Sequence, residues 1–94
     1  MKIIVAQAAA ADLARLHDFL ADKSPAAANR AAAALIAAIR SLDTFPERGR
    51  PSSPNIRELI VPFGQSGYVL RYAFREHDDE VVVLRIWHSR EQRE

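Results

Sequence analysis

The sequence predicts an α+β fold, in which an N-terminal strand and an antiparallel helical hairpin pack on a small antiparallel sheet. Apolar residues recur at helical spacing from residue 8 to 42 and at alternating positions from residue 56 to 88, with a proline-rich loop between the two regions. The 94 residues, 49% of them hydrophobic, supply material for one core, so residues 1–94 are expected to form one domain.

Residues 3–22 are predicted to form a strand followed by a helix. Residues 3–5 are β-rich, and the chain then turns to alanine. From residue 8 to 22, leucines recur at helical spacing with Phe19 beside them, which predicts an amphipathic helix. The apolar positions are Leu13, Leu16 and Leu20, and those expected on the surface are Asp12, Arg15, Asp18 and Asp22.

A second helix is predicted from Pro25 to about Leu42. Ser24 suits its N-cap and Pro25 its first position, where no backbone donor is needed. Its many alanines permit close approach of another backbone, and the short link between the helices predicts an antiparallel hairpin. The predicted apolar stripe consists of Leu35, Ile36, Ile39 and Leu42.

Three prolines and a glycine in residues 45–54 end the helix and predict a loop. Strands are predicted at 56–61, 68–74 and 80–88, and their short connectors favour an antiparallel meander. Strict alternation places one set of side chains on the helix-covered face and the other set on the opposite face. The first set is Leu70, Tyr72, Phe74, Val82, Leu84 and Ile86; the second is Val69, Arg71, Ala73, Val83, Arg85 and Trp87.

Each predicted strand of this meander carries one arginine: Arg57, Arg71 and Arg85. Arginine is rarely buried without a partner, so such a row is a candidate surface for phosphates or carboxylates. Whether Arg57 joins the other two depends on the strand register. The alternative is that Arg71 and Arg85 are surface residues paired with Glu58 or Glu80 on a solvated face.

Other candidates lie near the chain's C-terminus and in the loop. Trp87 is suited to stacking on a base or anchoring a partner; the alternative is that it only caps the sheet. His88 is suited to proton transfer; the alternative is a structural hydrogen bond. Arg48 and Arg50 are candidates for binding acidic residues of a partner, although charged loops are often only solvated.

Composition excludes several classes of protein. The net charge of +1 argues against a polycation, and the lack of cysteine excludes disulfides, thiolate metal sites and a cysteine nucleophile. The sequence has no metal-ligand spacing and no apolar run near the roughly 20 residues of a membrane span. We therefore expect a soluble cytoplasmic protein without metal or cofactor.

The order strand, helix, helix and three antiparallel strands resembles the toxins of the RelE/ParE superfamily, which belong to bacterial type II toxin-antitoxin modules. The resemblance covers nearly the whole chain. The segments that carry it are Ala11–Leu13, Ser24–Ala28, Leu42–Pro51, Arg57–Pro62, Gly67–Tyr72 and Val83–Arg90.

The resemblance implies a cognate antitoxin, a hetero-oligomer with it, and one of two activities. Members resembling RelE cut messenger RNA on the ribosome; in that case Arg57, Arg71 and Arg85 would stabilise charge, and His88 or Glu58 would transfer protons. Members resembling ParE inhibit DNA gyrase. That activity needs a binding surface and no catalytic residue.

Two departures favour the gyrase-inhibiting branch. Many ribonuclease members have a pattern like Arg-Leu-Val-Tyr where this chain has Val69-Leu70-Arg71-Tyr72, so its arginine is displaced by about 7 Å along the strand. The usual C-terminal tyrosine is also absent from residues 89–94. The residues predicted to contact the target are Arg57, Arg71, Arg85, Trp87, His88 and Arg90, and those predicted to contact the antitoxin are Arg48 and Arg50.

Overall fold

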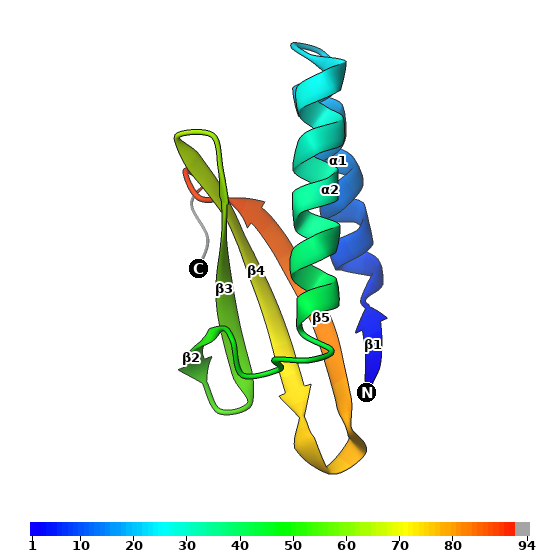
Figure 1. Ribbon diagram of the computed structural model, residues 1–94, viewed down its shortest axis with the longest axis vertical. Helices are drawn as coiled ribbons and strands as arrows, with labels where there is room; N and C mark the ends of the chain where they lie inside the picture. Colours follow the sequence, from blue (N-terminus) through cyan, green and yellow to red (C-terminus); the bar gives the residue numbers. More distant parts are fainter. Residues whose placement is uncertain (92–94) are drawn as a thin grey trace.

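The structure, a computed structural model, describes residues 1–91 and confirms the predicted α+β fold. A helical hairpin lies along a five-stranded sheet, and its tip rises beyond the sheet (Figure 1). The strands stand in the order β1-β5-β4-β3-β2. The elements are β1 (Lys2–Val5), α1 (Gln7–Ala21), α2 (Pro25–Ser41), β2 (Arg50–Ser53), β3 (Ile56–Phe63), β4 (Ser66–Arg75), a 3-10 turn (Glu76–Asp78) and β5 (Glu80–His88).

The helices begin and end within a residue of the predicted positions. Ser24 caps α2 as expected, because its Oγ accepts the N–H of Ala27 at 3.1 Å. Two predicted apolar positions are instead exposed: Phe19 is 61% exposed and Ile36 is 40% exposed. Asp12, expected on the surface, is only 4% exposed. No helix within residues 1–91 has the length and apolarity to cross a membrane.

The sheet contains the predicted antiparallel meander and two further pairings. β3 pairs with β4 and β4 with β5, both antiparallel. β1 lies parallel to β5, from Lys2 opposite Glu80 to Val5 opposite Val83, so the sheet is mixed. The loop predicted at 45–54 contains β2, which pairs antiparallel with β3.

A β-bulge in β5 corrects the predicted faces of this strand. Arg85 lies opposite Arg71, but Val83 lies opposite Tyr72, so Leu84 is an extra residue without a counterpart in β4. The extra residue reverses the alternation. Val81 and Val83 are therefore buried in the core before the bulge and Ile86 after it, whereas Val82 and Leu84 are only partly buried.

Tyr72 fastens the loop before β2 to the core. Its buried ring carries a hydroxyl that donates to the carbonyl of Pro46 at 2.7 Å and accepts the N–H of Gly49 at 2.8 Å. A Cβ at Gly49 would lie 2.8 Å from Cε1 of Tyr72, so this close approach requires glycine. The contact sets where β2 begins.

Candidate target-binding face

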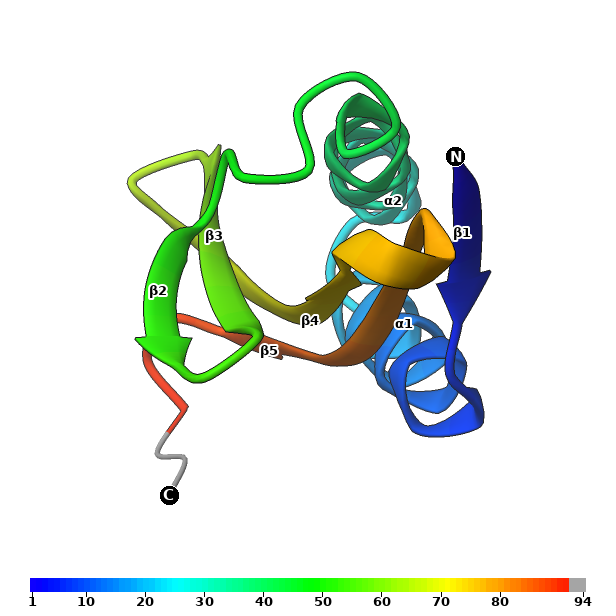
Figure 2. The same cartoon turned by 90° about the horizontal axis from the view of Figure 1, so that it is seen from below.

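Four charged residues form a row across the face of the sheet that points away from the core. Directly opposite residues share a face of the sheet, and Arg50 lies opposite Glu58, Glu58 opposite Arg71, and Arg71 opposite Arg85. We call Arg50, Glu58, Arg71 and Arg85 the charged row. Figure 2 looks along the helices and shows β2 and β3 at the side of the sheet far from α1.

Arg57 does not belong to the charged row. It lies opposite Tyr72, whose side chain is in the core, so Arg57 is on the helix-covered side of the sheet. Its Nη1 donates to the carbonyl oxygens of Gly49 at 2.7 Å and Glu47 at 3.2 Å, and its Nη2 lies 3.4 Å from a carboxylate oxygen of Glu47. The structure therefore places Arg57 as a support of the loop before β2, and it does not join a strip with Arg71 and Arg85.

Arg71 is held by Glu58 on the neighbouring strand. Its Nε and Nη2 both donate to Oε2 of Glu58, at 3.0 and 2.8 Å. Its Cζ lies 4.8 Å from the centre of the Trp87 ring, within range of a cation–π contact. Glu58 was one of the two partners, with Glu80, that were considered from the sequence. The Arg71 side chain remains partly exposed beside Glu58.

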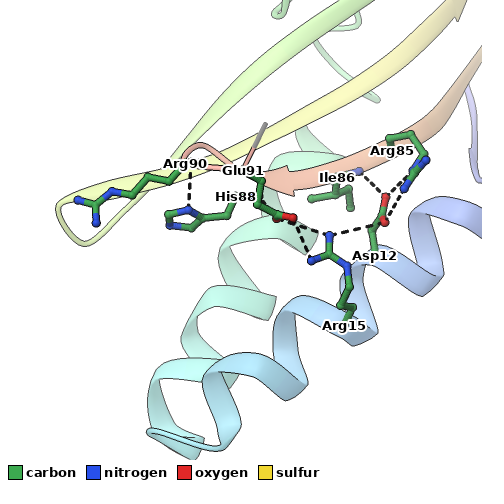
Figure 3. A network of polar contacts seen from close by, with 7 residues as sticks. All are labelled: Asp12, Arg15, Arg85, Ile86, His88, Arg90 and Glu91. Carbon is green, nitrogen blue, oxygen red and sulfur yellow. Dashed lines mark hydrogen bonds and ion pairs between the residues drawn. The ribbon is translucent and has the colours of Figure 1, made fainter. Parts of the chain in front are cut away.

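Arg85 pairs with Asp12 of α1 and with neither Glu58 nor Glu80. Its Nε donates to Oδ2 of Asp12 at 2.8 Å and its Nη2 to Oδ1 at 3.1 Å (Figure 3). Oδ2 also accepts the backbone N–H of Ile86 at 2.9 Å. A buried carboxylate is thus satisfied by three hydrogen bonds, as a charge in a protein interior must be.

Electrostatics at this pair follow from the geometry. Burial raises the pKa of Asp12, but the hydrogen bonds from Arg85 and Ile86 and the positive charges of Arg85 and Arg15 outweigh burial, so its pKa is lowered from the usual 3.8. The hydrogen bond to Asp12 raises the pKa of Arg85 in turn. Both groups are therefore charged at neutral pH.

His88 lies on the other face of the sheet from the charged row. It is opposite Tyr68, and the two rings meet edge to face with centres 5.5 Å apart. Its Nδ1 accepts the backbone N–H of Arg90 at 3.2 Å, so in the neutral ring Nε2 carries the proton and donates to Oγ of Ser66 at 3.0 Å. Of the two roles considered for His88, these contacts correspond to the structural hydrogen bond.

The C-terminal segment is fastened to α1 by Glu91. Its carboxylate oxygens accept from Arg15 at 3.2 and 3.5 Å, and Oε1 also accepts the backbone N–H of His88 at 2.8 Å. Nη2 of Arg15 lies 3.8 Å from Oδ1 of Asp12, so Arg15 bridges the two carboxylates (Figure 3). The Arg90 side chain is exposed and points away from this network (Figure 3).

Asp12, Arg15 and Glu91 form a network that was not predicted from the sequence. A signal for Asp12 was present, because it lies three residues after Ala9 and four before Leu16, two buried positions of α1. Helical spacing alone places it on the buried stripe. No local pattern pairs it with a residue 73 positions away.

The two arginines predicted to contact a partner lie at the start of β2 and just before it. Nη1 of Arg48 donates to Oγ of Ser41 at 2.8 Å, and Arg50 is exposed at the end of the charged row. Within residues 1–91 no three His, Asp or Glu side chains gather as metal ligands would.

Comparison with known proteins identifies the family. The family model described as "ParE toxin of type II toxin-antitoxin system, parDE" matches residues 3–93. The chain is 45% identical to Toxin RelE1 of Caulobacter vibrioides over 97% of its length and 96% of the relative's, and 43% identical to Toxin RelE3 of the same organism over 87% of each.

A solved structure has the same fold. The toxin-antitoxin structure titled "Chromosomal ParDE TA system from P. aeruginosa" superposes with a TM-score of 0.75 at 24% identity, over 94% of this chain and 95% of that one. Together, the family match and the close relatives extend over nearly the whole chain. The chain belongs to the ParE toxin family, within the RelE/ParE superfamily of type II toxin-antitoxin toxins.

Proposed function

We propose that this toxin arrests growth by binding DNA gyrase through the charged row, without cleaving RNA. The observation that carries this proposal is the pair Arg71 and Arg85, which lie directly opposite one another on the face of the sheet away from the core. Each arginine is paired with one carboxylate, Arg71 with Glu58 and Arg85 with Asp12, yet both side chains stay partly exposed. Two neighbouring guanidinium groups that are held in place and still exposed are suited to binding an acidic surface.

The positions of the proton-transfer candidates support binding over cleavage. RNA cleavage through the 2'-hydroxyl requires an acid or base beside the groups that stabilise the phosphate. His88 is on the opposite face from Arg71 and Arg85, where it contacts Ser66 and Tyr68. Glu58 is on the correct face, but one of its carboxylate oxygens already accepts both hydrogen bonds from Arg71.

A type II toxin implies a cognate antitoxin, and we propose that Arg48 and Arg50 contact it. Arg50 lies in β2, which forms one edge of the sheet, and every residue of β2 is exposed. An edge strand offers unpaired backbone groups to an added strand of a partner. Acidic antitoxin residues beside such a strand would pair with these two arginines.

The test uses the purified toxin in two assays. We expect it to inhibit DNA supercoiling by gyrase and to leave ribosome-bound messenger RNA intact. The variant Arg71→Ala should inhibit gyrase at least about tenfold less well, since it removes a charged group from the contact surface. The matched control Arg30→Ala makes the same change at an exposed arginine of α2 and should inhibit like the wild type. Cleavage of ribosome-bound messenger RNA would instead identify a ribonuclease.

A further inference from the structure

The bulge in β5 determines on which face Arg85 lies. Val83 faces the core, and in a regular strand a residue two positions later would face the core as well. The extra residue Leu84 reverses the alternation, so Arg85 emerges beside Arg71. Because Val81 and Val83 face the core, Arg85 lies on the proposed target-binding face only through this bulge.

Asp12 contacts the chain immediately after the bulge. β1 pairs with β5 only as far as Val83, and the chain that follows β1 then enters α1. At this junction the N–H of Ala6 donates to the carbonyl of Val83 at 2.9 Å. Beyond that point Asp12 accepts the N–H of Ile86. The side-chain carboxylate thus accepts a backbone N–H of β5 beyond the end of β1, next to the bulge.

The same carboxylate fixes the direction of the Arg85 side chain. Asp12 accepts from Nε and Nη2 of Arg85, a side-on arrangement that holds the guanidinium plane at two points. Within residues 1–91, Nη1 of Arg85 makes no hydrogen bond, and the side chain is 43% exposed. Asp12 therefore holds the edge of the guanidinium group that carries Nε and Nη2, and Nη1 remains available to a binding partner.

From these contacts we propose that Asp12 is a positioning residue, which holds Arg85 on the target-binding face and in the orientation that meets the target. This proposal rests on the proposed function in one respect, namely that the charged row is the surface that contacts the target. Asp12 itself is only 4% exposed, so it offers almost no surface of its own to a target. Its effect on target binding passes through Arg85.

The decisive variant is Asp12→Asn. Asparagine keeps a carbonyl oxygen for the N–H of Ile86 but loses the negative charge that orients Arg85. Asp22→Asn is the matched control, because it makes the same change at an exposed position near the end of α1. Arg85→Gln and the double variant Asp12→Asn with Arg85→Gln complete a double-mutant cycle.

Three measurements are made on each variant: affinity for purified gyrase, growth arrest at graded expression, and unfolding in urea. We expect Asp12→Asn to weaken gyrase binding about tenfold, the lower end of the effect of a charged hydrogen bond. The double variant should bind no more weakly than Arg85→Gln alone, because Asp12 acts through Arg85. A fourth measurement compares only the wild type with Asp12→Asn: hydrogen exchange at Nε–H of Arg85, followed by nitrogen-15 NMR, should be faster in Asp12→Asn.

Two results would overturn the proposal. One is an Asp12→Asn protein that is less stable but binds gyrase and arrests growth like the wild type while folded. The other is an additive loss in the double variant, which would show that Asp12 and Arg85 act independently. If the wild type arrests growth without binding gyrase, the target is wrong, and the same cycle measured by growth arrest still decides the role of Asp12.

Discussion

Ile86→Ala and Leu84→Ala test the bulge that places Arg85 on the target-binding face. Each substitution removes three carbons, and strict alternation would bury both side chains equally. In the structure Ile86 is 0% exposed within the core, whereas Leu84 is partly exposed at the bulge. Three buried carbons are worth about 2.4 kcal/mol of transfer free energy, and the cavity adds to this.

We therefore expect Ile86→Ala to lower the free energy of unfolding by about 2–5 kcal/mol and Leu84→Ala by only about 1 kcal/mol. For a domain of this size, the first corresponds to a fall in Tm of at least about 10 °C. Urea unfolding followed by circular dichroism and by the fluorescence of Trp87, the single tryptophan, measures both. An equal cost for the two substitutions would refute the bulge at Leu84.

Three further predictions follow from other contacts. Tyr72→Phe should cost about 1–3 kcal/mol of unfolding free energy in urea, because the N–H of Gly49 loses its acceptor; an unchanged midpoint would contradict this role for the hydroxyl. Burial raises the pKa of Asp12, but its hydrogen bonds lower the pKa overall. The carboxylate therefore stabilises the folded state above pH 3.8, and this contribution disappears as the pH falls through the lower pKa of the folded state. As the pH is lowered, the free energy of unfolding of the wild type should therefore approach that of Asp12→Asn. A difference in this free energy that persists at about pH 1 would argue against a stabilising role of the Asp12 charge. Co-expression with the adjacent reading frame should yield one stable complex with this toxin, and full growth with a high yield of toxin expressed alone would count against an antitoxin.

The sequence by itself determined the two helices and the strands β1, β3, β4 and β5 in their order, but not β2. Helical spacing of leucines, the Ser24 and Pro25 start signal and the change to alternating strands are local patterns, and local patterns are what a sequence displays. These features also carried the resemblance to the RelE/ParE superfamily, which the family match over residues 3–93 confirmed. The placement of Arg71 and Arg85 on one face was also expected from alternation, although for Arg85 the reasoning assumed a regular strand; their direct cross-strand pairing was not predicted.

Only the tertiary structure decided how the charged side chains are partnered. The bulge at Leu84 and the register that turns Arg57 toward the helices arise from strand pairing, which depends on contacts between distant residues. The ion pair of Asp12 with Arg85 joins the first helix to the last strand, across 73 positions. A buried carboxylate and a surface carboxylate look alike in a sequence, because burial is a property of the packed chain and not of the residue.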